Sequence, residues 1–111
     1  MGKFVVTTRK NGEFQFNLVA GNGQVILSSE GYSTKAACLN GVESVKKNSQ
    51  EMARFDKKTT ESGAFRFNLK ATNGQVIGVS QNYTTEAACN NGIESVMKNA
   101  PDAVISDETV V

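Results

Sequence analysis

The feature that most constrains this chain is a duplication within its own sequence. Residues 12–48 read GEFQFNLVAGNGQVILSSEGYSTKAACLNGVESVKKN, and residues 63–99 read GAFRFNLKATNGQVIGVSQNYTTEAACNNGIESVMKN. The two stretches align at a constant offset of 51 residues without a gap, and about two positions in three are identical. In a chain of 111 residues this repeat leaves little else, so any fold must be built from two copies of one unit.

Each copy opens with residues that alternate between apolar and polar, as in a half-buried strand. Phe14, Phe16 and Leu18 share one side in the first copy, as Phe65, Phe67 and Leu69 do in the second. Asn-Gly follows in both copies, at 22–23 and 73–74. This dipeptide predicts a type I′ hairpin turn with positive φ at both central residues. Such a turn pairs Leu18 with Leu27 and Ala20 with Val25, and it leaves Val19 beside Ile26.

A further strand precedes each of these, at 3–8 (KFVVTT) and at 52–59 (MARFDKKT). A two-residue hairpin at Asn11-Gly12 would set charged residues of the second copy opposite core positions. Shifting the register by one residue places Phe4 opposite Leu18 and Phe55 opposite Leu69. Because a one-residue slip moves every side chain to the other face, the pattern favours the longer loop.

A helix follows the third strand of each copy and runs to about Asn48 or Asn99. Ser33 and Thr84 are the expected N-cap residues. The apolar stripe is expected to face the sheet, and glycine within it indicates a close approach of helix and sheet. The stripe consists of Thr34, Cys38, Gly41, Val42 and Val45, and of Thr85, Cys89, Gly92, Ile93 and Val96. Both cysteines are therefore expected to be buried and reduced.

Each copy thus reads strand, strand, strand, helix and a short apolar stretch. About fifty residues form a marginal core on their own. Two units that share one sheet solve this problem, so we expect a single α+β domain over residues 1–111, made of two intertwined repeats at about 1–52 and 53–111.

The motif F-x-F-x-L-x-A-x-N-G-Q-x-I, then Tyr, then A-x-x-x-G-I-x-S-V-x-x-N (with Val for Ile in the first copy), occurs twice and resembles the YegP-like bacterial proteins. The resemblance covers nearly the whole chain. It implies tandem β3-α-β repeats in a single antiparallel sheet, with swapped strands and two helices packed on one face. It also implies that members with a single unit pair as dimers. It brings no activity and no catalytic or binding residue.

Composition narrows the possible chemistry. The formal net charge is +1 and the chain has no histidine, which disfavours a general nucleic-acid binder and a Cys/His zinc site. No apolar run is long enough to cross a membrane, so a soluble, cytoplasmic protein is expected. No nucleotide-binding or catalytic motif is present. The sequence therefore predicts no enzyme activity, no catalytic residue, no cofactor and no metal.

One polar surface is identical in the two copies, whereas nearby exposed positions differ, as Gln15 and Arg66 or Lys35 and Glu86 do. The helical wheel places it on the outer faces of the helices. Its residues are Asn40, Glu43, Ser44, Lys47 and Asn48, and Asn91, Glu94, Ser95, Lys98 and Asn99. Two interpretations of this identity remain open. In the first, the residues are unchanged only because the duplication is recent. In the second, they are a contact surface for a protein partner that the chain carries twice.

The sheet face away from the helices is the second candidate, since it carries Val19 and Ile26, Ile77 and Val79, with Arg66 and Lys70 nearby. The leading hypothesis is a small non-enzymatic interaction module, a monomer with pseudo-two-fold symmetry, acting through its outer helix faces or its open sheet face. The alternative is weak binding of RNA or single-stranded nucleic acid on the sheet face. The phenylalanines of the sheet are expected to point to the core, so they cannot stack on nucleic-acid bases at the open face. This counts against the nucleic-acid alternative.

If the two copies share one sheet, residues 50–111 alone should not fold as a monomer. The fragment should be unfolded, or should pair with itself by exchanging its last strand. Circular dichroism and sedimentation of the fragment measure this. A stably folded monomeric fragment would show that the repeats are independent.

Overall fold

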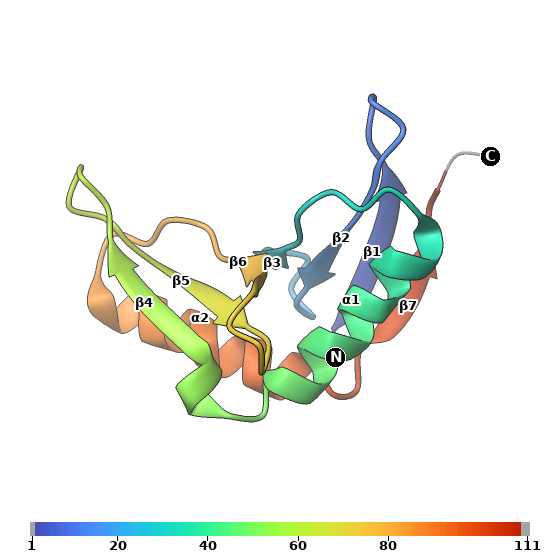
Figure 1. Ribbon diagram of the computed structural model, residues 1–111. Coiled ribbons are helices and arrows are strands. Elements are labelled where there is room, and N and C mark those ends of the chain that lie inside the picture. The colour runs from blue at the N-terminus through green and yellow to red at the C-terminus, as the bar shows by residue number, and fades with distance from the viewer. Residues whose placement is uncertain (1, 110–111) are drawn as a thin grey trace.

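The computed structural model describes residues 2–109, and in this range seven strands form one mixed sheet with two α-helices on one of its faces (Figure 1). The strands follow the order β4-β5-β6-β3-β2-β1-β7 across the sheet. The elements are β1 (Lys3–Thr8), β2 (Phe14–Val19), β3 (Val25–Ser28), α1 (Lys35–Asn48), a 3₁₀ turn (Met52–Arg54), β4 (Phe55–Thr59), β5 (Phe65–Lys70), β6 (Val76–Val79), α2 (Glu86–Asn99) and β7 (Val104–Asp107). Neither helix has the length and apolar composition needed to cross a bilayer.

The first hairpin of each repeat has the register that the hydrophobic pattern predicts. Phe4 lies opposite Leu18, and Phe55 lies opposite Leu69. Phe4 and Leu18 are fully buried on the helix side of the sheet. The alternative with a two-residue turn would have turned these side chains to the open face, which is why burial selects the longer loop.

The single sheet with both helices on one face is confirmed, with one difference. All pairings are antiparallel except that of β7, which runs parallel to β1 and makes the sheet mixed. The chain returns from the end of α2 to the outer edge of the first repeat, so β7 belongs to repeat two in sequence and to repeat one in space (Figure 1). The halves of the sheet meet at the antiparallel pair β3–β6, where Ser28 lies opposite Val79.

The Asn-Gly hairpins do not form the predicted type I′ turn. Gly23 has φ +86°, but no residue other than glycine has positive φ among residues 2–109. The amide of Gly23 donates to the carbonyl of Ala20 at 2.9 Å, and a bulge follows Leu18. This is a four-residue turn that ends in one left-handed glycine, so a single positive φ is enough.

The strand pairing near this turn changes with it. Leu18 pairs with Leu27 as expected, but the expected pairs Ala20–Val25 and Val19–Ile26 are wrong, because the bulge sets Val19 opposite Val25.

Each helix begins one residue later than predicted. The N-caps are Thr34 and Thr85, not Ser33 and Thr84. The hydroxyl oxygen of Thr34 accepts from the amide of Ala37 at 3.1 Å. This satisfies one of the amides that the first turn of a helix leaves without a partner.

The apolar stripe of each helix meets the sheet as predicted, apart from the exposed capping threonines. Cys38 and Cys89 are free thiols with no exposed surface, and burial raises the pKa of both. Each helix also reaches beyond its own repeat: α1 contacts β2 and also β5 and β6, and α2 contacts β5 and also β3. The core therefore runs continuously under both repeats.

Gly41 and Gly92 are the points of closest approach. A Cβ at Gly41 would lie 2.9 Å from Cζ of Tyr32 and 3.0 Å from Phe16, both on the sheet side. The Tyr32 ring stacks on Phe16 with centroids 6.2 Å apart. A side chain at this position would have to displace an aromatic pair from a packed core.

We expect Gly41→Leu to destabilise the protein by overpacking, on the order of 1–3 kcal/mol. Gly21→Thr is the matched control, because Gly21 is exposed and the second repeat already carries Thr72 at that place. Urea unfolding of both variants measures the difference. An unchanged midpoint for Gly41→Leu would contradict the close helix–sheet contact.

Candidate functional site

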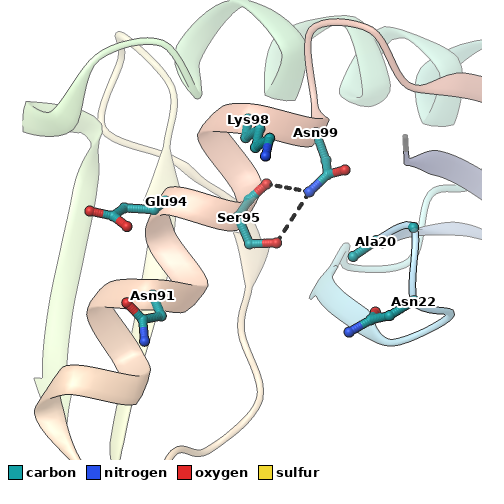
Figure 2. Close-up of a pocket in the computed structure, with 8 residues that line it drawn as sticks. Ala20, Asn22, Asn91, Glu94, Ser95, Lys98 and Asn99 are labelled. Carbon is teal, nitrogen blue, oxygen red and sulfur yellow. Dashed lines mark hydrogen bonds between the residues drawn. The ribbon is translucent and has the colours of Figure 1, made fainter.

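Two clefts lie on the helix side of the molecule, each between the helix of one repeat and a hairpin turn of the other. The first, of about 490 Å³, is formed by α2 and the β2–β3 turn (Figure 2). The second, of about 430 Å³, is formed by α1 and the β5–β6 turn. We call them the α2 cleft and the α1 cleft. The α2 cleft is lined by Ala20, Gly21, Asn22, Asn91, Glu94, Ser95, Lys98 and Asn99, and the α1 cleft by Ala71, Thr72, Asn73, Asn40, Glu43, Ser44, Lys47 and Asn48.

The two linings correspond position for position at the offset of 51, and they differ only where Gly21 replaces Thr72. All ten helix residues that the repeat comparison selected are here, five in each cleft. The six turn residues were not selected, because Asn-Gly was already explained by hairpin chemistry. The only signal that could have pointed to them is that the turn, too, is almost unchanged between the copies.

The cleft residues come together because of helix geometry. Positions 91, 94, 95, 98 and 99 are spaced as neighbours on one side of a helix. The opposite wall is held by its own turn: the side-chain oxygen of Asn22 accepts from the amide of Gln24 at 3.0 Å, and Asn73 does the same for Gln75. Both walls are therefore fixed by local hydrogen bonds before any ligand is present.

Four of the ten residues do not form the free outer surface that the helical wheel predicted. Asn48 is only 6% exposed, and its amide donates to the carbonyl and hydroxyl oxygens of Ser44 at 2.8 and 3.2 Å. Asn99 and Ser95 repeat these bonds at the same distances, as Figure 2 shows. A wheel treats the helix in isolation, but the chain turns back at the end of α1, where the amide of Glu51 donates to Asn48.

The remaining polar groups are available. Within residues 2–109, the side chains of Asn40, Lys47, Asn91, Glu94 and Lys98 have no hydrogen-bond or ion-pair partner, and they are exposed. Glu43 has only a long ion pair with Lys46, at 4.0 Å. Each cleft thus offers one free amide, one carboxylate and one ammonium group.

The free groups of the α2 cleft do not all point the same way. The Glu94 carboxylate is directed away from the β2–β3 turn (Figure 2). Such a set can hydrogen-bond and pair with charges, but it contains no nucleophile with a neighbouring base. No three residues among His, Cys, Asp and Glu come together as a metal site in the described range.

The open sheet face is less available than expected. Ile26 and Ile77 are only 6% and 9% exposed. Lys70 pairs with Asp56 at 3.2 Å, and this contact lowers the pKa of the Asp56 carboxyl, helped by Lys58. The side-chain oxygens of Asn17 and Asn68 are buried and have no hydrogen-bond partner in the described part of the chain. Of the two basic residues proposed for nucleic acid, Arg66 alone is exposed and has no acidic partner between residues 2 and 109.

Comparison with known proteins identifies the repeat. A family model described as "Domain of unknown function (DUF1508)" matches residues 10–56 and again residues 61–107. The chain belongs to the DUF1508 family. A UPF0339 protein of Stutzerimonas stutzeri, described as lying in the ptx operon 5′ region, is 55% identical over 104 residues, which cover 94% of each chain. One from Pseudomonas aeruginosa is 49% identical over 107 residues, 96% of this chain and 97% of the other.

Two solution NMR structures of DUF1508 relatives show the same architecture. The protein of unknown function YegP from Escherichia coli superposes with a TM-score of 0.94 at 42% identity, covering 99% of this chain and 95% of the other. A UPF0339 protein from Shewanella oneidensis superposes with a TM-score of 0.92 at 46% identity, covering 97% and 92%. The resemblance seen in the sequence is confirmed, and the named relatives carry no assigned activity.

The two kinds of cleft residue should respond differently to truncation. We expect Asn48→Ala to cost about 1 kcal/mol of stability, because a buried amide loses two hydrogen bonds. The matched Asn40→Ala on the same helix should stay within about 0.5 kcal/mol of the parent, since its side chain is exposed. Thermal and urea unfolding of both variants tests this. Equal effects would mean that the hydrogen bond to Ser44 does not hold the end of the helix.

Proposed function

We propose that this protein is a small non-enzymatic interaction module that binds a partner protein through its two equivalent clefts. The observation that carries the proposal is that the same polar residues line both clefts while neighbouring exposed positions have diverged. The groups that would contact the partner are Asn40, Glu43 and Lys47 in the α1 cleft, and Asn91, Glu94 and Lys98 in the α2 cleft.

The pairing of the clefts gives the proposed function a defined stoichiometry. Two equivalent sites on one chain suit a partner that presents the same determinant twice, for example the two subunits of a symmetric dimer. Binding the second site is then intramolecular, so two weak contacts add to a much tighter one. The amide, carboxylate and ammonium groups suit a polar peptide surface, which offers donors, acceptors and charges at similar spacing.

The arrangement of each cleft favours a single functional domain. Each cleft takes its helix from one repeat and its turn from the other, so a separated repeat would contain neither cleft in full. We therefore propose that residues 1–111 act as one domain.

Binding is favoured over catalysis by the position of the reactive groups. Cys38 and Cys89 are buried with raised pKa values, which is a poor setting for a thiolate. Glu43 and Glu94 line different clefts, whereas an acid–base pair has to converge on one substrate.

The test is affinity capture from a bacterial lysate with four forms of the full chain. One variant carries Asn40→Ala and Lys47→Ala, a second carries Asn91→Ala and Lys98→Ala, and a third carries all four changes. The control carries Lys10→Ala and Glu61→Ala, at exposed turn positions that line neither cleft. We expect the control to retain a partner, the single-cleft variants to bind it more weakly, and the four-fold variant to lose it.

A partner that all forms retain equally would contradict the proposal. A fluorescent single-stranded RNA probe, titrated in parallel at rising salt concentration, tests the alternative function. Tight binding that falls steeply with salt would favour nucleic acid on the sheet face and count against the clefts.

A further inference from the structure

The two repeats differ at the outer edges of the sheet, because, within residues 2–109, only the first strand of repeat one is paired on its outer side. In repeat one, β7 pairs with β1 and covers its edge. In repeat two, β4 takes the place of β1 and is itself the edge of the sheet. At the offset of 51, β7 corresponds to residues 53–56, which are the end of the 3₁₀ turn and the first two residues of β4. That segment cannot be both the first strand of repeat two and the strand that covers it.

The contacts between β7 and β1 show which interactions an added edge strand makes. The carbonyl of Val6 accepts from the amide of Glu108 at 2.8 Å, so the backbone of β1 is paired on its outer side. Ile105 lies opposite Phe4. Asp107 lies opposite Val6 and forms an ion pair with Lys35, the first residue of α1. Lys35 is the main reason that the pKa of Asp107 falls to about 2.

The uncovered edge presents an equivalent groove between β4 and α2. A cavity of about 270 Å³ is lined there by Met52, Lys57, Asn90, Ile93 and Glu94. Met52 is 58% exposed, which makes it one of three large exposed apolar side chains in the described range. The other two, Val104 and Ile105, lie on β7 at the opposite edge of the sheet.

The helix residue beside this groove has the opposite charge to its equivalent at the covered edge. The helix residue equivalent to Lys35 is Glu86. The Glu94 carboxylate lines the same groove and has no partner among residues 2–109. Lys57 takes the place of Val6, but its ammonium group is already engaged, 3.0 Å from Asn90 and 3.8 Å from Glu86. Two carboxylates thus face one ammonium group, and the groove is left with an excess of negative charge.

We propose that β4 and this groove bind an extended segment of a partner protein as an added strand parallel to β4. The segment carries an aliphatic side chain opposite Phe55, in the place that Ile105 has beside Phe4. Two residues later it carries Lys or Arg, in the place of Asp107, where it meets Glu86. Main-chain hydrogen bonds supply affinity and the two side chains supply specificity, as in other cases of strand addition.

The backbone of β4 is positioned for this role. Lys57 pairs with Phe67 as Val6 pairs with Phe16, so the outward backbone of Lys57 corresponds to that of Val6, whose carbonyl accepts from the amide of Glu108. A lysine on an edge strand often blocks pairing. Here its side chain is drawn along α2 by Asn90 and Glu86, which leaves the edge itself open. The β7 strand of a second copy is disfavoured, because its Asp107 would meet Glu86.

The probe is a capped peptide of residues 102–109 with Asp107→Lys, titrated into the isotope-labelled full chain. We expect NMR shift changes centred on β4, Asn90 and Ile93, while β1 and β7 stay unchanged. The unaltered peptide, which keeps Asp107, should bind a few-fold more weakly. A scrambled peptide is the composition control.

A pair of variants separates the backbone from the side chain. Lys57→Pro removes the outward amide at a position where an edge strand tolerates proline, and it should abolish binding. Lys57→Ala keeps the amide and should bind. The Asn40→Ala, Lys47→Ala variant should bind the peptide like the parent, so a failed cleft proposal would leave this result intact.

Three results would overturn the inference. The first is the absence of shift changes near β4 at about 1 mM peptide. The second is equal binding by Lys57→Pro and Lys57→Ala. The third is a chain that dimerises on its own in sedimentation and loses this with Lys57→Pro, which would make a second copy the occupant.

Discussion

The rest of the structure depends on the way each helix bridges the two repeats. Helix α1 packs on β2 of its own repeat and on β5 and β6 of the other, while α2 packs on β5 and β3. One repeat of about fifty residues forms only a marginal core on its own. Because the helices cross the junction, the hydrophobic core spans β3 and β6 without interruption, and the sheet needs little direct pairing there.

The same crossing produces both clefts. A helix that stayed over its own strands would meet its own hairpin, but here each helix ends beside the turn of the other repeat. Gly41 and Gly92 let the helices approach Tyr32 and Tyr83 of their own repeats closely. The polar residues on the other side of each helix lie beside the turn of the other repeat, so the same packing that forms the core also creates a repeated polar site.

Sharing a strand between repeats has a second consequence, at the edges of the sheet. β4 ends the first β3-α-β unit and begins the second, so the described residues form seven strands where two complete units would give eight. The molecule is therefore symmetric in its core and clefts but asymmetric at its edges. Lys35 and Glu86 occupy equivalent helix positions and lie next to these two different edges. Lys35 pairs with Asp107 of β7, and Glu86 pairs with Lys57 of β4.

The sequence by itself determined the repeat, the strands, the helices and the register of the first hairpins, because burial allows only one register for Phe4 and Phe55. It also determined which helix residues face the core, since Cys38 and Val42 follow helical spacing. Only the tertiary structure decided the turn type, the parallel pairing of β7 and the burial of Asn48. Turns, edges and helix ends depend on what packs against them from elsewhere in the chain, and that information is absent from the local pattern of any one segment.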